Sequence, residues 1–283
     1  MRGLATHPAA RGFGDDCAVI EFGNETLILT HDMLVEGVHF LPGQDPADVA
    51  WKLVATNMSD LAAKGAEPVG VLLGYILGCD DARFVEGLHQ ALAHFNAPLL
   101  GGDTVSGQGP QVLGLTALGR ATHTPVPSRA GAKPGDALYL TGPVGAAMIG
   151  LEALRSGSPD SAADSLAYRR PIALLDEGQA LAPHVTAMMD VSDGLLLDAA
   201  RLARASGITL AIDSAAVPIA APETRRGEAL RWGDDYQLLF AASTDAVLPI
   251  PCHRIGIAQK QSLAPIVLDG LALSEADGLG YQH

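Results

Sequence analysis

Segments typical of strands alternate with segments typical of helices along this 283-residue chain, and this alternation restricts its fold more than any other feature. Short runs rich in valine, leucine and isoleucine are followed by longer stretches that begin and end with helix-capping residues. The expected strands are 17–22, 25–30, 68–78, 111–121, 137–140, 186–189, 208–213 and 238–242, and the expected helices are 45–64, 80–95, one from 144 onward, 171–183 and 193–206. The order of these elements predicts an α/β or α+β fold.

A break in this pattern divides the chain near its middle. The sequences TPVP at 124–127 and KPGD at 133–136 are loop and turn signals, and the alternation of strands and helices restarts after them. We therefore predict two domains, residues 1–125 and residues 126–283.

The composition narrows the class of partner and the compartment. Hydrophobic residues make up 48% of the chain, and the formal net charge of −14 offers no basic footprint for nucleic acid or an anionic membrane. The cysteines, Cys17, Cys79 and Cys252, form no C-x-x-C pair, so neither a disulfide framework nor a structural zinc site is expected. Residues 1–14 lack a signal-peptide core and the apolar stretch 69–78 is too short to span a bilayer, so we expect a cytoplasmic protein.

Aspartates stand where α/β proteins place ligand-binding groups. Asp16 lies in a Gly-Asp-Asp sequence before a strand, Asp32 ends the strand run that includes 27–30, and Asp103 follows two glycines. Asp190 and Asp193 belong to the sequence DVSDG, directly after another apolar run. Any one of these aspartates is ordinary turn chemistry. If several converge, however, their oxygens are the ligands that Mg²⁺ prefers.

Asp60 differs from the other aspartates because it lies inside the predicted helix 45–64. Asp45 suits the N-cap of this helix, Pro46 its first position, and Gly65 its stop. A carboxylate within the otherwise apolar stretch 58–63 must be paired or bound to a metal if it is buried.

The common nucleotide-binding motifs are missing from the chain. There is no G-x-x-x-x-G-K-[ST], no H-R-D with D-F-G, and no G-x-G-x-x-G after a strand. The nearest glycine-rich sequence, TGPVG at 141–145, opens a helix whose N-terminus could receive a phosphate, although glycine there also permits close strand–helix packing.

Six motifs, taken in order, resemble one family. They are GDDCA at 14–18, DMLVEGVHF at 32–40, NMSDLAA at 57–63, GGDT at 101–104, SRAGAKPGD at 128–136 and DVSDGL at 190–195. Together they resemble the thiamine-monophosphate kinase family, within the aminoimidazole-ribonucleotide synthetase-like superfamily, and the match extends from Gly12 to Tyr281. The block at 32–40 is the most specific, because it separates this kinase from related enzymes.

The resemblance implies a two-domain, synthetase-like fold and a reaction. The N-terminal domain (1–125) would bind ATP and Mg²⁺ and pair with a second copy into a dimeric β-barrel, and the C-terminal α/β domain (126–283) would pack against it. The implied reaction transfers phosphate from ATP to thiamine phosphate, giving ADP and thiamine diphosphate, with several Mg²⁺ ions. The run 69–76, apolar on both faces, separately favours a homodimer, because such a strand left as an exposed edge promotes aggregation.

The resemblance also assigns roles to residues. The implied Mg²⁺ ligands are Asp16, Thr30, His31, Asp32, Asp60, Asp103, Asp190 and Asp193, with Thr30 and the position of His31 contributing oxygens. The residues at ATP-contacting positions are Gly102, Asp103, Arg129 and Ser192, and those near thiamine phosphate are His39, Asp234 and Tyr281. Asp32, Asp103 and Asp193 are the expected catalytic residues.

Four features depart from the family pattern. His31 stands where a residue with a hydroxyl group is usual, and Asp234 replaces a glutamate with a longer reach. Lys64 puts a cation beside the helix where methionine is usual. The segment before Gly14 is short, so an N-terminal helix of the family is expected to be truncated.

Two other functions stay open at this point. One is another ATP-using enzyme of the same superfamily, similar to aminoimidazole-ribonucleotide synthetase. The other is a protein that binds thiamine phosphate or a nucleotide without turnover. An assay of ATP consumption separates the second from an enzyme.

Overall fold

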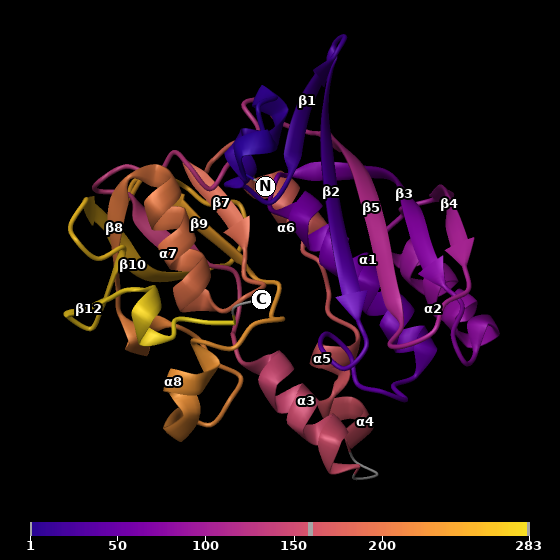
Figure 1. Cartoon of the computed structure of the whole chain (residues 1–283). Helices are drawn as coiled ribbons and strands as arrows, with labels where there is room; N and C mark the ends of the chain where they lie inside the picture. The colour runs from indigo at the N-terminus through magenta and orange to yellow at the C-terminus, as the bar shows by residue number, and fades with distance from the viewer. Residues whose placement is uncertain (1, 158–160, 282–283) are drawn as a thin grey trace.

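The computed structural model describes residues 2–157 and 161–281, whose strands form two sheets connected by the segment 122–136 (Figure 1). The first sheet has the order β1-β2-β5-β3-β4 and is antiparallel except for the β3–β4 pair. Its strands are β1 (Ala18–Phe22), β2 (Glu25–Val35), β3 (Ala66–Ile76), β4 (Leu99–Val105) and β5 (Val112–Ala121). Helices α1 (Pro46–Ala62) and α2 (Asp81–His94) pack together and share a core with this sheet.

The second sheet has the order β12-β11-β8-β10-β6-β9-β7. Its strands are β6 (Ala137–Leu140), β7 (Ala187–Asp190), β8 (Ile208–Ile212), β9 (Leu238–Ala242), β10 (His253–Lys260), β11 (Ile266–Leu268) and β12 (Leu271–Leu273). The helices of this half are α3 (Ala146–Ser156), α4 (Ser161–Asp164), α5 (Leu166–Arg169), α6 (Leu175–Leu181), α7 (Leu195–Ser206) and α8 (Arg226–Ala229). Short 3-10 turns occur at Arg2–Leu4, Pro8–Phe13, Ser214–Ala216, Glu223–Arg225 and Glu275–Asp277. The predicted α/β class is therefore confirmed.

Helix α1 lies at the centre of the molecule, between the two sheets (Figure 1). As predicted, Asp45 is its N-cap, with the carboxylate accepting a hydrogen bond of 2.9 Å from the Ala47 amide. The helix packs on β2 and β5 of the first half and on α5, α6 and β7 of the second. Nearly every residue of α1 is buried, so its polar side chains need partners inside the protein.

These partners come largely from the second half of the chain. Lys52 on α1 forms an ion pair of 2.9 Å with Asp234, and Ser59 donates a hydrogen bond of 2.6 Å to Asp190. Asp48 forms ion pairs with two consecutive arginines, Arg169 and Arg170. The polar groups of one helix thus connect the two halves across their junction.

Three expectations about strands were wrong. Strand β2 continues to Val35 because its pairing with β5 extends to the Val35–Val112 pair, so Asp32 lies inside the strand and does not end it. Asp103 likewise lies inside β4, which includes both glycines before it. Strand β3 is an inner strand between β5 and β4, so the exposed-edge argument for the run 69–76 does not apply. The sheet edges are β1 and β4, and strands β4, β10, β11 and β12 were not expected.

Strands β2, β3 and β4 of the first sheet expose apolar side chains. Met33 on β2 is 51% exposed, Leu72 on β3 is 47% exposed, and β4 is exposed at every residue, including Leu99 and Leu100. An exposed apolar surface on a sheet edge is a typical feature of a protein–protein interface. Among the helices in the described ranges, none combines the length and the apolar character that crossing a bilayer requires.

The contact between α6 and the end of α1 leaves no room for a side chain at Gly178. A Cβ atom there would lie 2.0 Å from the backbone oxygen of Ala62. We predict that Gly178→Ala lowers the free energy of unfolding by about 1–3 kcal/mol, because the two helices must separate. Urea unfolding followed by tryptophan fluorescence measures this change.

Gly227, in α8, is the matched control. A Cβ atom there would meet only a side-chain nitrogen of Arg231, at 3.8 Å. Gly227→Ala should leave the urea midpoint unchanged or raise it, since alanine favours a helix by up to about 1 kcal/mol. A wild-type midpoint for Gly178→Ala would show that α6 does not pack this closely on α1.

Candidate functional site

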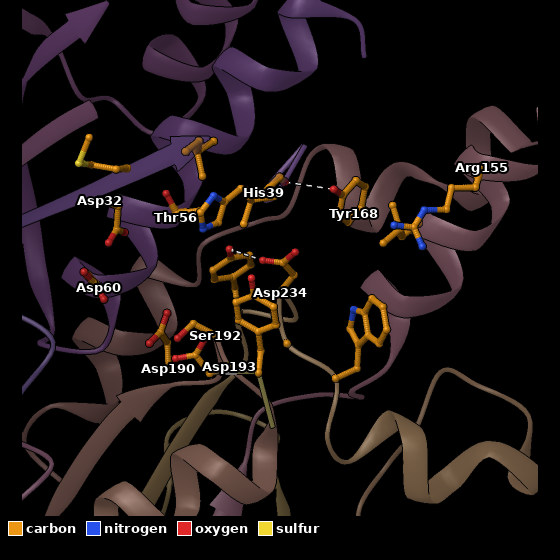
Figure 2. Close-up of a pocket in the computed structure, with 18 residues that line it drawn as sticks. Asp32, His39, Thr56, Asp60, Arg155, Tyr168, Asp190, Ser192, Asp193 and Asp234 are labelled. Atoms are coloured by element: carbon orange, nitrogen blue, oxygen red, sulfur yellow. Dashed lines mark hydrogen bonds between the residues drawn. The ribbon is translucent and has the colours of Figure 1, made fainter. Parts of the chain in front are cut away.

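A cleft of about 480 Å³ lies between the two halves of the chain, and its two ends differ in chemistry (Figure 2). One end is acidic, with Asp32, Asp60, Asp190 and Asp193 on its walls. The cleft is also lined by aromatic rings and one arginine, namely Tyr168, Trp232, Tyr236, Tyr281 and Arg155, of which Tyr168 and Arg155 lie at the other end, away from these aspartates (Figure 2). Such a cleft suits a ligand with an anionic group at one end and a ring system at the other.

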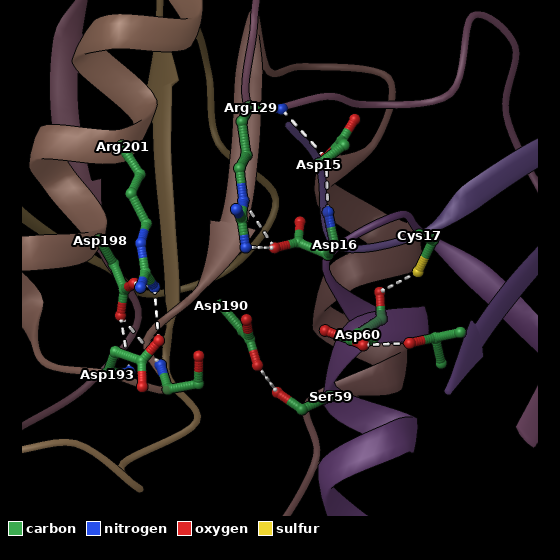
Figure 3. Close-up of polar contacts among 12 residues, drawn as sticks. Asp15, Asp16, Cys17, Ser59, Asp60, Arg129, Asp190, Asp193, Asp198 and Arg201 are labelled. Carbon is green, nitrogen blue, oxygen red and sulfur yellow. Dashed lines mark hydrogen bonds and ion pairs between the residues drawn. The ribbon is translucent and has the colours of Figure 1, made fainter. Parts of the chain in front are cut away.

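Three carboxylates form the centre of the acidic end. Asp16 precedes β1, Asp60 is on α1, and Asp190 ends β7, yet each offers an oxygen within 4.8 Å of the others (Figure 3). Asp32, from the middle of β2, lines the same end of the cleft. The structure therefore brings together four of the aspartates predicted from the sequence, and they come from three strands or strand ends and one helix.

Hydroxyl and amide groups orient these carboxylates. Thr30 on β2 donates a hydrogen bond to the Asp60 carboxylate, and Ser59 donates one to Asp190. The backbone amide of Asp32 donates to the side-chain oxygen of Asn57 at 3.2 Å. Because Asn57, Ser59 and Asp60 all lie on the last turns of α1, that helix positions the whole group.

The raised pKa values of Asp60 and Asp190 show that these carboxylates lack a nearby positive charge. Burial, together with the charges of Asp32 and Asp190, raises the pKa of Asp60 well above its ordinary value. Burial and the charge of Asp16 raise the pKa of Asp190 to about 8. Among the described residues, no lysine or arginine lies within ion-pair distance of Asp60 or Asp190. Clustered carboxylates of this kind fit a hard divalent cation such as Mg²⁺.

The Asp15–Asp16 pair, in contrast, is surrounded by basic side chains. Asp15 forms ion pairs of 2.5 Å with both Arg11 and Lys64, and Asp16 pairs with Lys64 and Arg129. The pKa of Asp15 is well below its ordinary value, since these cations outweigh the effect of burial. Burial lowers and the two aspartates raise the pKa of Lys64, and the net shift is upward. Oδ2 of Asp16 is buried and lies 2.5 Å from the Lys64 ammonium nitrogen, so its charge is already opposed by a fixed cation.

The loop after β7 carries two predicted residues, Ser192 and Asp193. Their backbone amides donate hydrogen bonds of 3.1 and 3.0 Å to the buried carboxylate of Asp198, on α7. Arg201 forms ion pairs with both Asp193 and Asp198 (Figure 3). Burial raises the pKa of Asp198 to about 6. Asp198 thus fixes the conformation of the loop by accepting hydrogen bonds from its backbone. The sequence did not reveal this role, because an acidic residue in the first turn of a helix is common.

The three residues predicted to lie near thiamine phosphate all line the cleft: His39, Asp234 and Tyr281. The backbone amide of Tyr281 donates a hydrogen bond of 2.9 Å to the backbone oxygen of Asp193. Nδ1 of His39 accepts a hydrogen bond of 3.0 Å from the Val35 amide. The Asp234 carboxylate accepts one from Lys52 at 2.9 Å and one from Tyr236 at 2.8 Å. Asp234 and Tyr236 both have positive φ angles, so a left-handed backbone holds these groups at the cleft wall.

Three predicted residues do not reach the acidic end. Side chains alternate along β2, so His31 points away from Thr30 and Asp32, and its ring contacts Thr116 on β5. Asp103 lies three strands away from Asp32, which is roughly 14 Å at ordinary strand spacing. Gly102 packs so closely on β3 that a Cβ atom would lie 2.0 Å from the Leu73 oxygen.

The sequence analysis missed Tyr168 and Trp232, which line the cleft, and Lys52, which pairs with Asp234 on the cleft wall. The Lys52 side chain is 1% exposed, and its ammonium group lies 3.9 Å from the centre of the Tyr168 ring. A lysine on the apolar stripe of a predicted helix was the available signal for Lys52. Nothing comparable marked Tyr168 or Trp232, because their place in the cleft depends on how the two halves meet.

Comparison with known proteins agrees with this architecture. Residues 14–121 match the AIR synthase related protein N-terminal domain, and residues 133–248 match the corresponding C-terminal domain. The structure of AaThiL complexed with AMPPCP and TMP superimposes with a TM-score of 0.84 at 30% identity, covering 92% of this chain and 89% of that one.

Sequence relatives carry one activity in their names. The thiamine-monophosphate kinase of Salmonella typhimurium strain LT2 is 35% identical over 292 residues, which is 95% of this chain and 86% of the relative. That of Escherichia coli K12 is 39% identical over 249 residues, with coverages of 81% and 75%. With a relative this similar over most of both chains, the protein belongs to the thiamine-monophosphate kinase family.

Proposed function

We propose that this protein transfers the terminal phosphate of ATP to thiamine phosphate and so produces thiamine diphosphate. The observation that supports this most directly is the cleft, which has three converging carboxylates at one end and aromatic rings at the other. The similar structure of AaThiL is complexed with AMPPCP and TMP, a nucleotide analogue and the acceptor expected of such a kinase.

For this phosphate transfer the protein needs mainly to supply positive charge and to position the two substrates. A phosphate oxygen of thiamine phosphate is already anionic at neutral pH, so no general base is needed. Bound Mg²⁺ would offset the repulsion between the two phosphate-bearing substrates. The side chains proposed to hold these ions are Asp16, Thr30, Asp32, Asp60, Asp190 and Asp193, with Asp103 from a second subunit and the backbone oxygen of His31. Asp32, Asp103 and Asp193 remain the proposed catalytic residues.

The ATP and thiamine phosphate positions follow from the two ends of the cleft. Ser192 and Asp193 lie beside the acidic end, and Arg129 reaches the same region through its ion pair with Asp16. We propose that Arg129 and Ser192 contact ATP, together with Gly102 from the second subunit that supplies Asp103. The rings of Tyr168, Trp232 and Tyr281 would hold the flat, cationic thiamine group, next to His39 and Asp234.

We also propose that the working unit is a homodimer built on the first sheet. The exposed apolar side chains of β2, β3 and β4 need cover, and a second copy provides a matching surface. Asp103 is too far from Asp32 to act with it within one chain. A dimer in which the partner's β4 approaches β2 would deliver the missing carboxylate.

Product analysis tests the reaction itself. We expect ADP and thiamine diphosphate to form from ATP, Mg²⁺ and thiamine phosphate, and no ADP to form when free thiamine replaces thiamine phosphate. The reason is that the acceptor must be an anionic phosphate oxygen. Chromatography of the nucleotides and of the thiamine compounds measures both products. ADP release with thiamine alone would contradict this function, and binding of both substrates without ADP release would identify a non-catalytic binding protein.

Mixed dimers test the role of Asp103. We expect Asp32→Asn and Asp103→Asn each to abolish turnover, because each removes a charge at nearly constant shape. Unfolding and refolding the two variants together should restore about a quarter of wild-type activity, since half of the dimers are mixed and each has one intact site.

Asp32→Asn mixed with Asp60→Asn is the matched control, because both residues line the same cleft of one chain. That mixture should stay inactive. Failure of the Asp32→Asn and Asp103→Asn pair to recover activity, or full activity in a monomer by light scattering, would contradict the shared site.

Asp234→Ala tests the aromatic end. The change removes the acceptor of Lys52 and Tyr236, so the cleft wall loses its shape while the aspartates remain. We expect the KM for thiamine phosphate to rise roughly tenfold, with a smaller fall in kcat and an unchanged KM for ATP, as for lost ground-state binding. Asp234→Asn keeps one of the two acceptor oxygens, so its KM for thiamine phosphate should fall between those of wild type and Asp234→Ala. A selective rise in the KM for ATP would place Asp234 beside the other substrate.

A further inference from the structure

Lys64 is a charged group at the acidic end for which the proposed reaction has no use. Its side chain is 0% exposed, directly after the carboxyl end of α1. Its ammonium nitrogen lies 2.5 Å from Asp15 Oδ1, 2.5 Å from Asp16 Oδ2 and 3.3 Å from the backbone oxygen of Met188, on β7. Two carboxylates and a carbonyl are the oxygen ligands that a hard metal ion would take.

Lys64 helps to neutralise the two aspartates on its side of the cluster. Asp15 and Asp16 together face three fixed cations, Arg11, Lys64 and Arg129. This side of the cluster therefore carries no excess negative charge. Asp60 and Asp190 have no lysine or arginine within ion-pair distance in the described part of the chain, so no fixed cation there would oppose a bound metal ion.

The Lys64 side chain is enclosed and cannot swing out into solvent. The atoms around it belong to the N-terminal segment, the end of α1 and β7, so the ammonium group reaches water only if these elements separate. A divalent cation on the same side of Asp16 would meet a second positive charge at close range with little screening by water. The lysine and such an ion therefore exclude each other.

We propose that the Lys64 ammonium group is a built-in cation that takes the place of one divalent ion on the Asp16 side of the cluster. The protein then binds one ion fewer than its carboxylates could hold, and its ions gather at Asp32, Asp60 and Asp190. This inference rests on the proposed role of the cluster in binding metal.

Counting Mn²⁺ ions tests the proposal without relying on activity. Mn²⁺ alone is titrated into wild type and Lys64→Met, and free Mn²⁺ is followed by electron paramagnetic resonance. We expect Lys64→Met to bind one more ion per subunit than wild type. Its melting temperature should also rise more on addition of Mn²⁺, because the ion replaces the lost ammonium group between Asp15 and Asp16.

Lys52→Met is the matched control, since it removes another buried ammonium group, on α1 itself, whose partner is Asp234 and not Asp15 or Asp16. It should bind the same number of ions as wild type. An equal number of ions in wild type and Lys64→Met overturns the proposal. If Lys64→Met does not fold, Lys64→Gln removes the charge while it keeps both aspartates and offers an amide hydrogen-bond donor, and it is judged by the same count.

Asp60→Asn separates this proposal from the proposed function. If wild type binds Mn²⁺ and Asp60→Asn loses an ion, the cluster is a metal site, and the Lys64→Met count alone decides the role of Lys64. If wild type binds no Mn²⁺, the metal role of the cluster fails, and with it both proposals.

Discussion

The burial of α1 is the constraint on which the rest of the structure depends. The helix is enclosed by the first sheet on one side and by elements of the second half on the other, yet it carries Asp48, Lys52 and Ser59. A buried charge without a partner costs several kcal/mol, and a buried hydroxyl group also needs a hydrogen bond, so each of these side chains requires a partner inside the protein. Their partners are Arg169, Arg170, Asp234 and Asp190, all from the second half. The pairing of the polar side chains of α1 therefore also determines how the two halves of the chain pack together.

The cleft is a consequence of that arrangement. Its acidic end forms where the last turns of α1 meet the end of β7 and the segment before β1, so neither half holds the three carboxylates by itself. Its aromatic end forms where Lys52 reaches across to Asp234 and lies over Tyr168. One helix thus aligns both ends of the cleft, which is what a reaction between two bound substrates requires.

The first sheet connects the candidate site to the assembly of two chains. Its exposed apolar side chains and the position of Asp103 on β4 leave one chain with an uncovered surface and a carboxylate far from the others. A dimer built on this sheet would cover the apolar surface and, in the same step, bring Asp103 to the partner's cluster. In such a dimer the assembly and the chemistry are coupled through β4.

The resemblance of six motifs to one family implied that Asp16, Asp60 and Asp190 act as a group. Local patterns in the sequence were enough to predict the α/β class and the capped helix that begins after Asp45. These depend on capping and periodicity, which neighbouring residues determine. The length of β2, the distance of Asp103 and the outward direction of His31 depend on strand register, which is set by pairing with distant residues. The partners of Lys52 and Lys64 were equally out of reach, because a buried charge is paired only where separate elements of the folded chain meet.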